Sequence, residues 1–346
     1  MVYASRLTET GRHRLIRPME PLLRITGLRT VFPGEGKKDL AVVDGVDLTL
    51  MRGQTLGIVG ESGSGKSMLS LSVMGLVPPP GRIAAGGILF DGQDLVGLAP
   101  AAMRSLRGRR IAMIFQEPMT SLNPAHTIGA QIVEAIAAHE LGLSAATLRA
   151  RAVAALERVR IPDPARRIDD YPHQLSGGQR QRVMIAMALS CGPELLIADE
   201  PTTALDVTVQ AEILALLKTL QTETGMAMML ISHDLGVVAD MADTVAVMYA
   251  GQVVEHAPAA RLFTDAEHPY TLGLIASAPR ATTAGERLLA IEGNVPAPSA
   301  MPAGCRFHPR CVLAEPACTA APPAMRDFGP CHQARCVRAP IETLAA

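Results

Sequence analysis

This chain of 346 residues lacks several sequence features that mark nucleic-acid-binding, membrane-spanning or secreted proteins. It has no tryptophan and only 3% aromatic residues, which argues against a surface that stacks nucleic-acid bases. Its net charge of −1 provides no overall basic surface for nucleic acid. No uncharged apolar run reaches the roughly 18 residues that a membrane-spanning helix needs, and the first 20 residues lack the apolar segment of a secretory signal. We therefore expect a soluble protein rather than an integral membrane protein or a secreted one.

Apolar residues nevertheless make up 48% of the chain, which is enough for a sizeable core. Short apolar segments suited to buried strands alternate with helix-forming segments, and this order predicts a parallel sheet wrapped by helices. We expect strands at 22–28, 42–50, 55–59, 88–91, 195–198, 227–231 and 245–249. We expect helices at 66–76, 126–160, 179–189, 210–222 and 235–241. From about residue 264 proline and cysteine become frequent and no amphipathic period remains.

A glycine-rich segment follows the strand expected at 55–59 and precedes a helix. It fits the phosphate-loop pattern G-x-x-x-x-G-K-[ST] with Gly60, Glu61, Ser62, Gly63, Ser64, Gly65, Lys66 and Ser67. The glycines let backbone N–H groups converge on one point, and the N-terminus of the following helix adds partial positive charge. Lys66 is expected to reach the β- and γ-phosphates, and Ser67 to ligate Mg²⁺.

Two acids end the apolar strand expected at 195–198. Asp199 is expected to hold Mg²⁺ through water, and Glu200 to polarise the water that attacks the γ-phosphate. The alternative is an ordinary charged turn, but the phosphate loop earlier in the same chain favours the catalytic interpretation.

A serine and two glycines stand just before the helix expected at 179–189. Ser176 and Gln179 fit a capping box, so a plain helix cap is the simple alternative. A cap does not need Gly177 and Gly178, however. Adjacent glycines allow a backbone to approach something closely, and the helix N-terminus then faces an anion.

Taken in order, these segments resemble the motifs of ATP-binding cassette (ABC) ATPases. Residues 175–179 resemble the signature motif, Gln116 the Q-loop glutamine and Thr203–Asp206 the D-loop. His233 resembles the switch histidine, and Phe32 lies where the family often keeps an aromatic ring that stacks on adenine. The resemblance implies catalytic roles for Glu200, His233, Gln116 and Lys66. It implies nucleotide contacts from the phosphate loop, Phe32, Ser176, Gly177, Gly178, Gln179 and Asp206, and Mg²⁺ contacts from Ser67, Gln116 and Asp199.

The resemblance also implies an α/β fold of the P-loop ABC type. Such a cassette has a mixed-sheet core, an antiparallel β subdomain and a helical subdomain. We expect an N-terminal arm at 1–21, the ATPase domain at 22–263 with its helical subdomain at about 120–190, and an irregular cysteine-containing extension at 264–346. Each ATP site in this family needs two cassettes, because the partner's segment corresponding to Ser176–Gly178 covers the γ-phosphate. A second ATPase subunit, identical or related, is therefore expected.

Four further segments narrow the resemblance: 115–124, 205–210, 268–271 and 304–311. Over roughly residues 22–336 the chain is similar to the ATPase subunits of bacterial dipeptide, oligopeptide and nickel importers. This implies ATP hydrolysis coupled to uptake of peptides or a related solute, at the cytoplasmic face of the bacterial inner membrane. The implied partners are the second ATPase subunit, two integral membrane permease subunits and an extracytoplasmic solute-binding protein, with no nucleic acid.

Five of the six cysteines fall within 32 residues near the C-terminus: Cys305, Cys311, Cys318, Cys331 and Cys336. In a chain without a secretory signal, such a cluster indicates metal binding before disulfides. Four thiolates suit either a 4Fe-4S cluster or tetrahedral zinc, and the spacing alone does not choose between them. The resemblance to the importer subunits implies that these cysteines are ligands of a 4Fe-4S cluster. The pattern of those subunits favours Cys305, Cys311, Cys318 and Cys336, with Cys331 as the alternative fourth ligand.

Two other functions compete with import. The first is a soluble ABC ATPase that acts on nucleic acid or ribosomes. Such proteins often carry two cassettes, a long coiled coil or zinc modules inside the cassette, whereas this chain has one cassette and its cysteines follow it. The second is an exporter, which would often fuse membrane spans to the cassette. Import is the interpretation that the sequence favours.

Overall fold

The computed structural model describes residues 20–116, 121–203, 205–277 and 291–341. Most of the arm predicted at 1–21, part of the Q-loop segment and Ala204 lie outside the described residues. None of the helices in these ranges is both long enough and apolar enough to cross a membrane.

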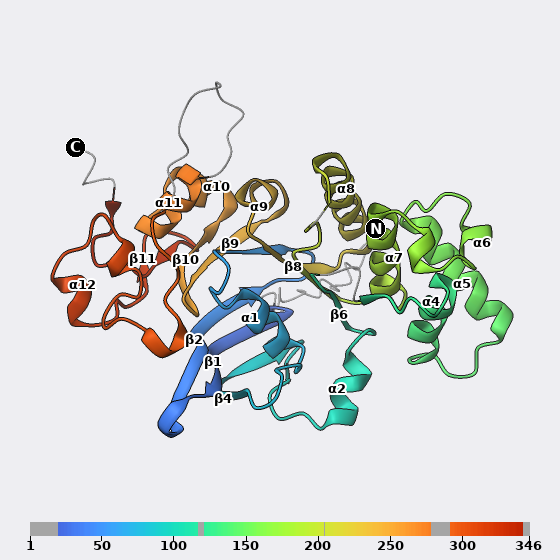
Figure 1. Cartoon of the computed structure of the whole chain (residues 1–346), viewed down its shortest axis with the longest axis horizontal. Coiled ribbons are helices and arrows are strands. Elements are labelled where there is room, and N and C mark those ends of the chain that lie inside the picture. Colours follow the sequence, from blue (N-terminus) through green and yellow to red (C-terminus); the bar gives the residue numbers. More distant parts are fainter. Residues whose placement is uncertain (1–19, 117–120, 204, 278–290, 342–346) are drawn as a thin grey trace, which may run out of the picture.

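Two sheets form the centre of the molecule (Figure 1). The smaller has the strand order β2-β1-β4-β5, and the larger has the order β11-β12-β10-β9-β3-β8-β7-β6. Their strands are β1 (Leu23–Pro33), β2 (Asp39–Leu50), β3 (Thr55–Val59), β4 (Arg82–Phe90), β5 (Gln93–Asp94), β6 (Ile111–Ile114), β7 (Leu195–Asp199), β8 (Ala227–Ser232), β9 (Thr244–Tyr249), β10 (Gln252–Pro258), β11 (Arg326–Asp327) and β12 (Gln333–Ala334).

Helices connect and cover these strands. The α-helices are α1 (Lys66–Val73), α2 (Pro100–Leu106), α4 (Ile128–Ala137), α5 (Ala145–Arg158), α6 (Pro164–Arg167), α7 (Gly177–Leu189), α8 (Val207–Thr224), α9 (Leu235–Met241), α10 (Ala259–Thr264), α11 (Pro269–Ser277) and α12 (Ala317–Ala320). Short 3-10 turns are η1 (Glu35–Lys37), η2 (Pro172–Gln174), η3 (Pro298–Ala300) and η4 (His308–Arg310).

The larger sheet is mixed. Strands β6, β7, β8, β3 and β9 run parallel, and β10, β12 and β11 add antiparallel pairs at one edge. Strands β7 and β8 are buried at every position, which explains why they are continuous apolar runs without alternation. Strand β9 is also apolar on both faces, and its successive side chains enter two different core clusters. Ala246 and Met248 face one cluster, and Val245, Val247 and Tyr249 face the other.

The smaller sheet is antiparallel throughout its described pairs and packs against the larger one. One core cluster joins the two, with Leu28 and Ile88 from the smaller sheet, Leu69 from α1, and Ile58 and Ile197 from the larger sheet. This packing holds α1, the helix that follows the phosphate loop, between the two sheets.

The helical subdomain α4–α7 lies at one end of the molecule, and the segment after residue 291 lies at the other (Figure 1). Side-chain caps define where these helices begin: the side chains of Thr127, Ser144 and Ser176 accept hydrogen bonds from the first turns of α4, α5 and α7. A separate core cluster joins the helical subdomain to the sheet through Ile132 and Ile185, among others.

The expected mixed sheet, antiparallel subdomain and helical subdomain are all present. The sequence did not predict β10 or the short strands β11 and β12. Strand β12 pairs with β10. The part of the chain after residue 264, called the C-terminal segment below, therefore extends the central sheet across the boundary expected near that residue. That domain boundary stays a prediction.

Candidate functional site

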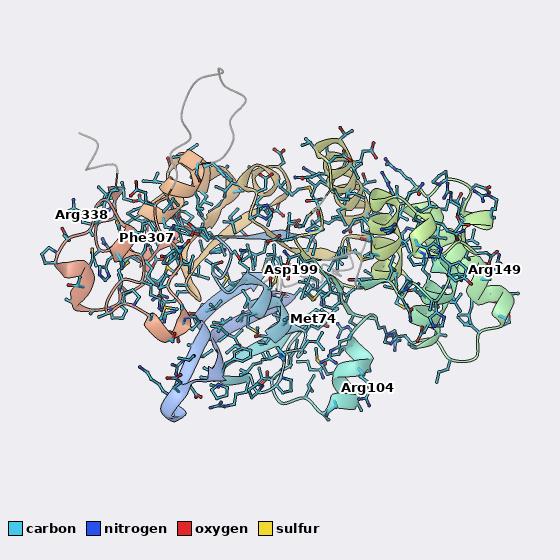
Figure 2. The ribbon with its side chains drawn as sticks, in the orientation of Figure 1. Met74, Arg104, Arg149, Asp199, Phe307 and Arg338 are labelled. Carbon is cyan, nitrogen blue, oxygen red and sulfur yellow. The ribbon has the colours of Figure 1, made fainter. Side chains whose placement is uncertain are left out.

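The predicted catalytic segments meet where the parallel strands of the larger sheet end, because each of them follows one of these neighbouring strands. Gln116 follows β6, Asp199 ends β7 and Glu200 follows it, His233 follows β8, and the phosphate loop follows β3. The carboxyl ends of parallel strands share one edge, where α/β proteins bind their ligands. Asp199 accordingly lies near the middle of the molecule (Figure 2).

A cavity of about 370 Å³ opens at this edge. Its walls come from the phosphate loop, from the catalytic strand ends, from β2 and from the C-terminal segment. The residues that line it are Ala41, Val42, Ser62, Gly63, Ser64, Gly65, Lys66, Ser67, Met68, Gln116, Glu200, Ala250, Gly251, Pro298 and Met301.

Two loop positions require glycine. Gly60 has φ of +151°, and a Cβ there would overlap the carbonyl oxygen of Met248. Gly65 has φ of +103°, and a Cβ there would lie 2.6 Å from the carbonyl oxygen of Val42. Both therefore combine a backbone conformation that favours glycine with a close approach of another chain segment.

Lys66 is buried and folds back over its own loop. Its Nζ donates to the carbonyl oxygen of Gly60 at 2.7 Å and to that of Glu61 at 2.9 Å. Burial lowers the pKa of Lys66, and the nearby carboxylates of Glu200, Asp199 and Glu61 act in the opposite direction. The ammonium group is thus held at the cavity among oxygen acceptors that a phosphate can replace.

Ser67 and Asp199 form an oxygen-rich pair beside Lys66. Ser67 Oγ donates to Asp199 Oδ1 at 3.3 Å, and Asp199 is 4% exposed. Burial is the main cause that raises the pKa of Asp199, while the hydrogen bond from Ser67 lowers it. A hydroxyl and a carboxylate are the hard oxygen donors that Mg²⁺ prefers, so these residues fit the ion predicted for them.

Glu200 is the centre of the cluster of predicted catalytic residues. Its Oε2 accepts a hydrogen bond from Gln116 Nε2 at 3.1 Å and lies 3.2 Å from His233 Nδ1. Its backbone has φ of +48°, an uncommon conformation for a residue with a side chain that often occurs at functional sites. The structure therefore brings together Gln116, Glu200 and His233, and their catalytic roles stay a prediction.

The signature segment lies apart from this cluster within the one chain. Ser176 and Gln179 form the predicted capping box at the start of α7, and Ser176 and Gly177 are exposed. A Cβ at Gly178 would lie 2.7 Å from Val209, so this glycine lets α7 pack closely against α8. The described walls of the cavity include no residue of 176–179.

Two other predicted nucleotide contacts lie away from the cavity walls. Asp206 caps α8, since its side chain accepts from Val209 N–H at 3.0 Å. The ring of Phe32 lies against Gly81, and Phe32 is not among the described residues that line the cavity. Adenine stacking by Phe32 stays a prediction.

Several residues at the site were not identified from the sequence. Thr203 was noted only as part of the D-loop, yet its Oγ1 donates to Glu200 Oε2 at 2.8 Å. Pro298 and Met301 from the C-terminal segment line the cavity. Tyr270 and Arg310 bind Glu61 of the phosphate loop. Thr203 stands three positions after Glu200, which is a local signal for it, but the other four residues lie in a segment without periodicity.

A second feature is a small cavity of about 10 Å³ in the C-terminal segment. Cys305, Cys311, Cys318 and Cys336 all line it, whereas Cys331 is exposed. Burial is the main cause that raises the pKa of the Cys311 thiol to about 11, and the other three cysteines act in the same direction. Within the described ranges, no group of three or more His, Cys, Asp or Glu side chains is arranged to hold a metal ion.

Comparison with known families agrees with this geometry. Residues 43–203 match the ABC transporter family, and residues 254–318 match the family described as the C-terminal region of oligopeptide/dipeptide transporters. A Brucella melitensis protein named as a peptide import ATP-binding protein is 50% identical over 331 residues, which cover 92% of this chain and 97% of that protein. The dipeptide transport ATP-binding protein DppD of Escherichia coli strain K12 is 49% identical over 315 residues, covering 91% and 96%.

Solved structures show the same fold. The ATP-binding cassette MJ0796, in a dimeric post-hydrolysis state with ADP and Pi, superposes with a TM-score of 0.61 at 27% identity, covering 68% of this chain and 98% of that one. The cassette cbiO1 of Clostridium perfringens, part of the transporter complex cbiONQ, gives a TM-score of 0.61 at 28% identity, covering 71% and 91%.

Proposed function

Because this chain belongs to the ABC transporter family, in the branch with an oligopeptide/dipeptide transporter C-terminal region, we propose that it is the ATP-hydrolysing subunit that drives peptide import. The observation that carries the proposal is the meeting of the phosphate loop with Asp199, Glu200, Gln116 and His233 at one sheet edge. The matched C-terminal region supports peptides as the solute.

We propose a role for each group at the site. The amides of the loop and the Lys66 ammonium bind the phosphates, while Ser67 and Asp199, with Gln116 as the third predicted contact, would hold Mg²⁺. Bound there, the ion would supply positive charge against the charge that develops on the phosphate oxygens. Glu200 accepts a proton from the attacking water, and Gln116 and His233 hold the carboxylate in place through Oε2. Thr203 adds a third contact to that oxygen.

A second cassette completes the site. Ser176 and Gly177 are exposed at the start of α7 and lie away from the cavity of their own chain, so they are free to cover the γ-phosphate held by a partner. Helix N-termini bind phosphate groups through their free N–H groups. The dimeric state of MJ0796 supports this arrangement. The partner is an identical or related ATPase subunit.

The remaining partners follow from peptide import. We place the chain at the cytoplasmic face of the bacterial inner membrane, bound to two integral permease subunits that an extracytoplasmic solute-binding protein supplies with peptide. The names of the relatives from Brucella and Escherichia coli support this assignment.

Purification of the tagged full chain from its own membranes tests this function. We expect two integral membrane subunits to copurify, and the reconstituted complex to take up labelled di- or oligopeptide only with ATP and binding protein. Recovery with ribosomes or DNA, without membrane subunits, would instead support the soluble ABC ATPase. Uptake of a nickel chelate but not of peptide would show that the transported solute is a nickel chelate rather than a peptide.

The C-terminal cysteines form a further part of the proposal. We propose that Cys305, Cys311, Cys318 and Cys336 bind a 4Fe-4S cluster. Their position around one cavity supports this ligand set, because four thiolates hold such clusters. No group in the described residues is arranged to hold a metal ion, so cluster binding requires these side chains to take other positions. Zinc is the alternative metal.

Replacing each candidate in turn decides whether Cys336 or Cys331 is the fourth ligand of the cluster. We expect Cys336→Ser to lose most of the iron and acid-labile sulfide of anaerobically purified protein, together with its broad visible absorbance. Cys331→Ser is the matched control and should retain both, because Cys331 is exposed and lies outside the cavity lining. Loss of iron from Cys331→Ser alone would reverse the assignment, and stoichiometric zinc in the wild type would replace iron.

A further inference from the structure

The C-terminal segment contacts the phosphate loop through a bidentate ion pair between Arg310 and Glu61. Arg310 Nη1 donates to Glu61 Oε2 at 2.8 Å, and Arg310 Nη2 donates to Glu61 Oε1 at 3.1 Å. The Arg310 side chain is 7% exposed and that of Glu61 is 28% exposed. Paired hydrogen bonds between a guanidinium and a carboxylate fix both direction and distance.

Arg310 is itself held rigidly. It donates to the carbonyl oxygens of Glu292, Ile291 and Gly293 at 2.8 to 3.2 Å. Its guanidinium carbon lies 5.7 Å from the centre of the Tyr249 ring. These contacts leave the guanidinium little freedom, so it presents a fixed fork to Glu61.

Glu61 is bound at three places. Its side chain is held by Arg310, its N–H donates to the Tyr270 hydroxyl at 2.8 Å, and its carbonyl accepts from Lys66 Nζ at 2.9 Å. Tyr270 and Arg310 both come from the segment after residue 264, and Lys66 is the phosphate-binding lysine. The shape of the phosphate loop near Gly60 and Ser62 therefore depends on contacts made from the C-terminal segment.

We propose that Arg310 is a positioning residue for the phosphate loop. Through Glu61 it holds the loop in the shape that binds phosphate, so that the C-terminal segment contributes to ATP binding. Nucleotide binds more tightly to a loop that is already ordered, because less conformational freedom is lost on binding. This inference rests on the proposed function, since it takes the loop to bind ATP.

A double-mutant cycle tests the pair. We expect Arg310→Gln and Glu61→Gln each to weaken binding of MgADP to the full chain about tenfold, measured by calorimetric titration. The double variant should bind no more weakly than either single variant, because the same interaction is lost in all three. In the ATPase assay we expect KM for ATP to rise by a similar factor while kcat changes less.

Two further variants separate positioning from general damage. Arg310→Lys keeps the charge but loses the fork, so we expect an intermediate affinity, and it serves where a glutamine variant fails to fold. Arg338→Gln breaks the Arg338–Glu315 ion pair of 2.6 Å within the C-terminal segment, and it should leave MgADP affinity unchanged. Thermal unfolding without nucleotide monitors folding in every variant.

Additive losses in the double variant, unchanged affinity in both single variants, or an equal loss in Arg338→Gln would overturn the inference. Failure of the wild-type chain itself to bind MgADP or MgATP would instead overturn the proposed function. The two failures are therefore distinguishable.

Discussion

Replacing Glu200 by glutamine is expected to reduce ATP turnover at least a hundredfold while leaving ATP binding intact. A general base contributes about 10²- to 10⁴-fold to a reaction, and an amide cannot accept the water's proton. The amide keeps the size of the carboxylate. The phosphate-loop groups proposed to hold the nucleotide do not depend on the Glu200 carboxylate for their contacts with it.

The same substitution is expected to trap the assembly before hydrolysis. If ATP binding closes two cassettes and hydrolysis releases them, Glu200→Gln should accumulate an ATP-bound dimer that is detectable by size-exclusion chromatography. Steady-state phosphate release and ATP titration measure the other two quantities.

Glu212→Gln provides the matched control for this experiment. Glu212 lies on α8 with its side chain 58% exposed and pairs with Arg182, so the same chemical change there should leave turnover within about twofold of the wild type. Near-normal turnover in Glu200→Gln would remove Glu200 from its assigned role. Equal loss in both variants would point to an effect on folding.

The phosphate loop and the strand-ending acids could be proposed from local signals, whereas Gln116 and His233 could be proposed only from the family resemblance. The phosphate loop requires a strand, glycines and a helix in sequence, and the acids Asp199 and Glu200 stand at the end of a buried apolar strand. Their convergence follows from neighbouring parallel strands, which is a property of the fold that the ABC resemblance supplies. Gln116 and His233 then meet Glu200 without any signal that links them in the sequence.

The contribution of the C-terminal segment could not be predicted. Arg310 and Glu61 are 249 positions apart, and no periodic pattern connects a proline- and cysteine-rich segment to a glycine loop. Strand β12 has only two residues, Gln333 and Ala334, and its pairing with β10 depends on tertiary packing rather than on β-propensity. For the same reason nothing in the sequence indicated that Pro298 and Met301 line the cavity at the phosphate loop.

Replacing Lys66 by alanine is expected to weaken MgATP binding about a hundredfold, or about 2.8 kcal/mol. Hydrogen bonds to charged groups contribute about 1.5–3 kcal/mol each, and Lys66 is 6% exposed, so solvent screens its charge little. The substitution also leaves the carbonyl oxygens of Gly60 and Glu61 without the donor that they share. We therefore expect the loop to lose both its charge and part of its shape.

Lys218→Ala is the control for the loss of a lysine charge. Lys218 is exposed on α8, and its Nζ donates to the carbonyl oxygen of Asp240 at 2.9 Å, so its removal should change MgATP affinity by less than about twofold. Calorimetric titration of both variants at the same ionic strength gives the comparison, because salt screens the exposed charge more than the buried one. Unchanged affinity in Lys66→Ala would mean that the loop does not hold the phosphates through this lysine. A hundredfold loss that appears in kcat but not in affinity would move Lys66 from nucleotide binding to stabilisation of the transition state.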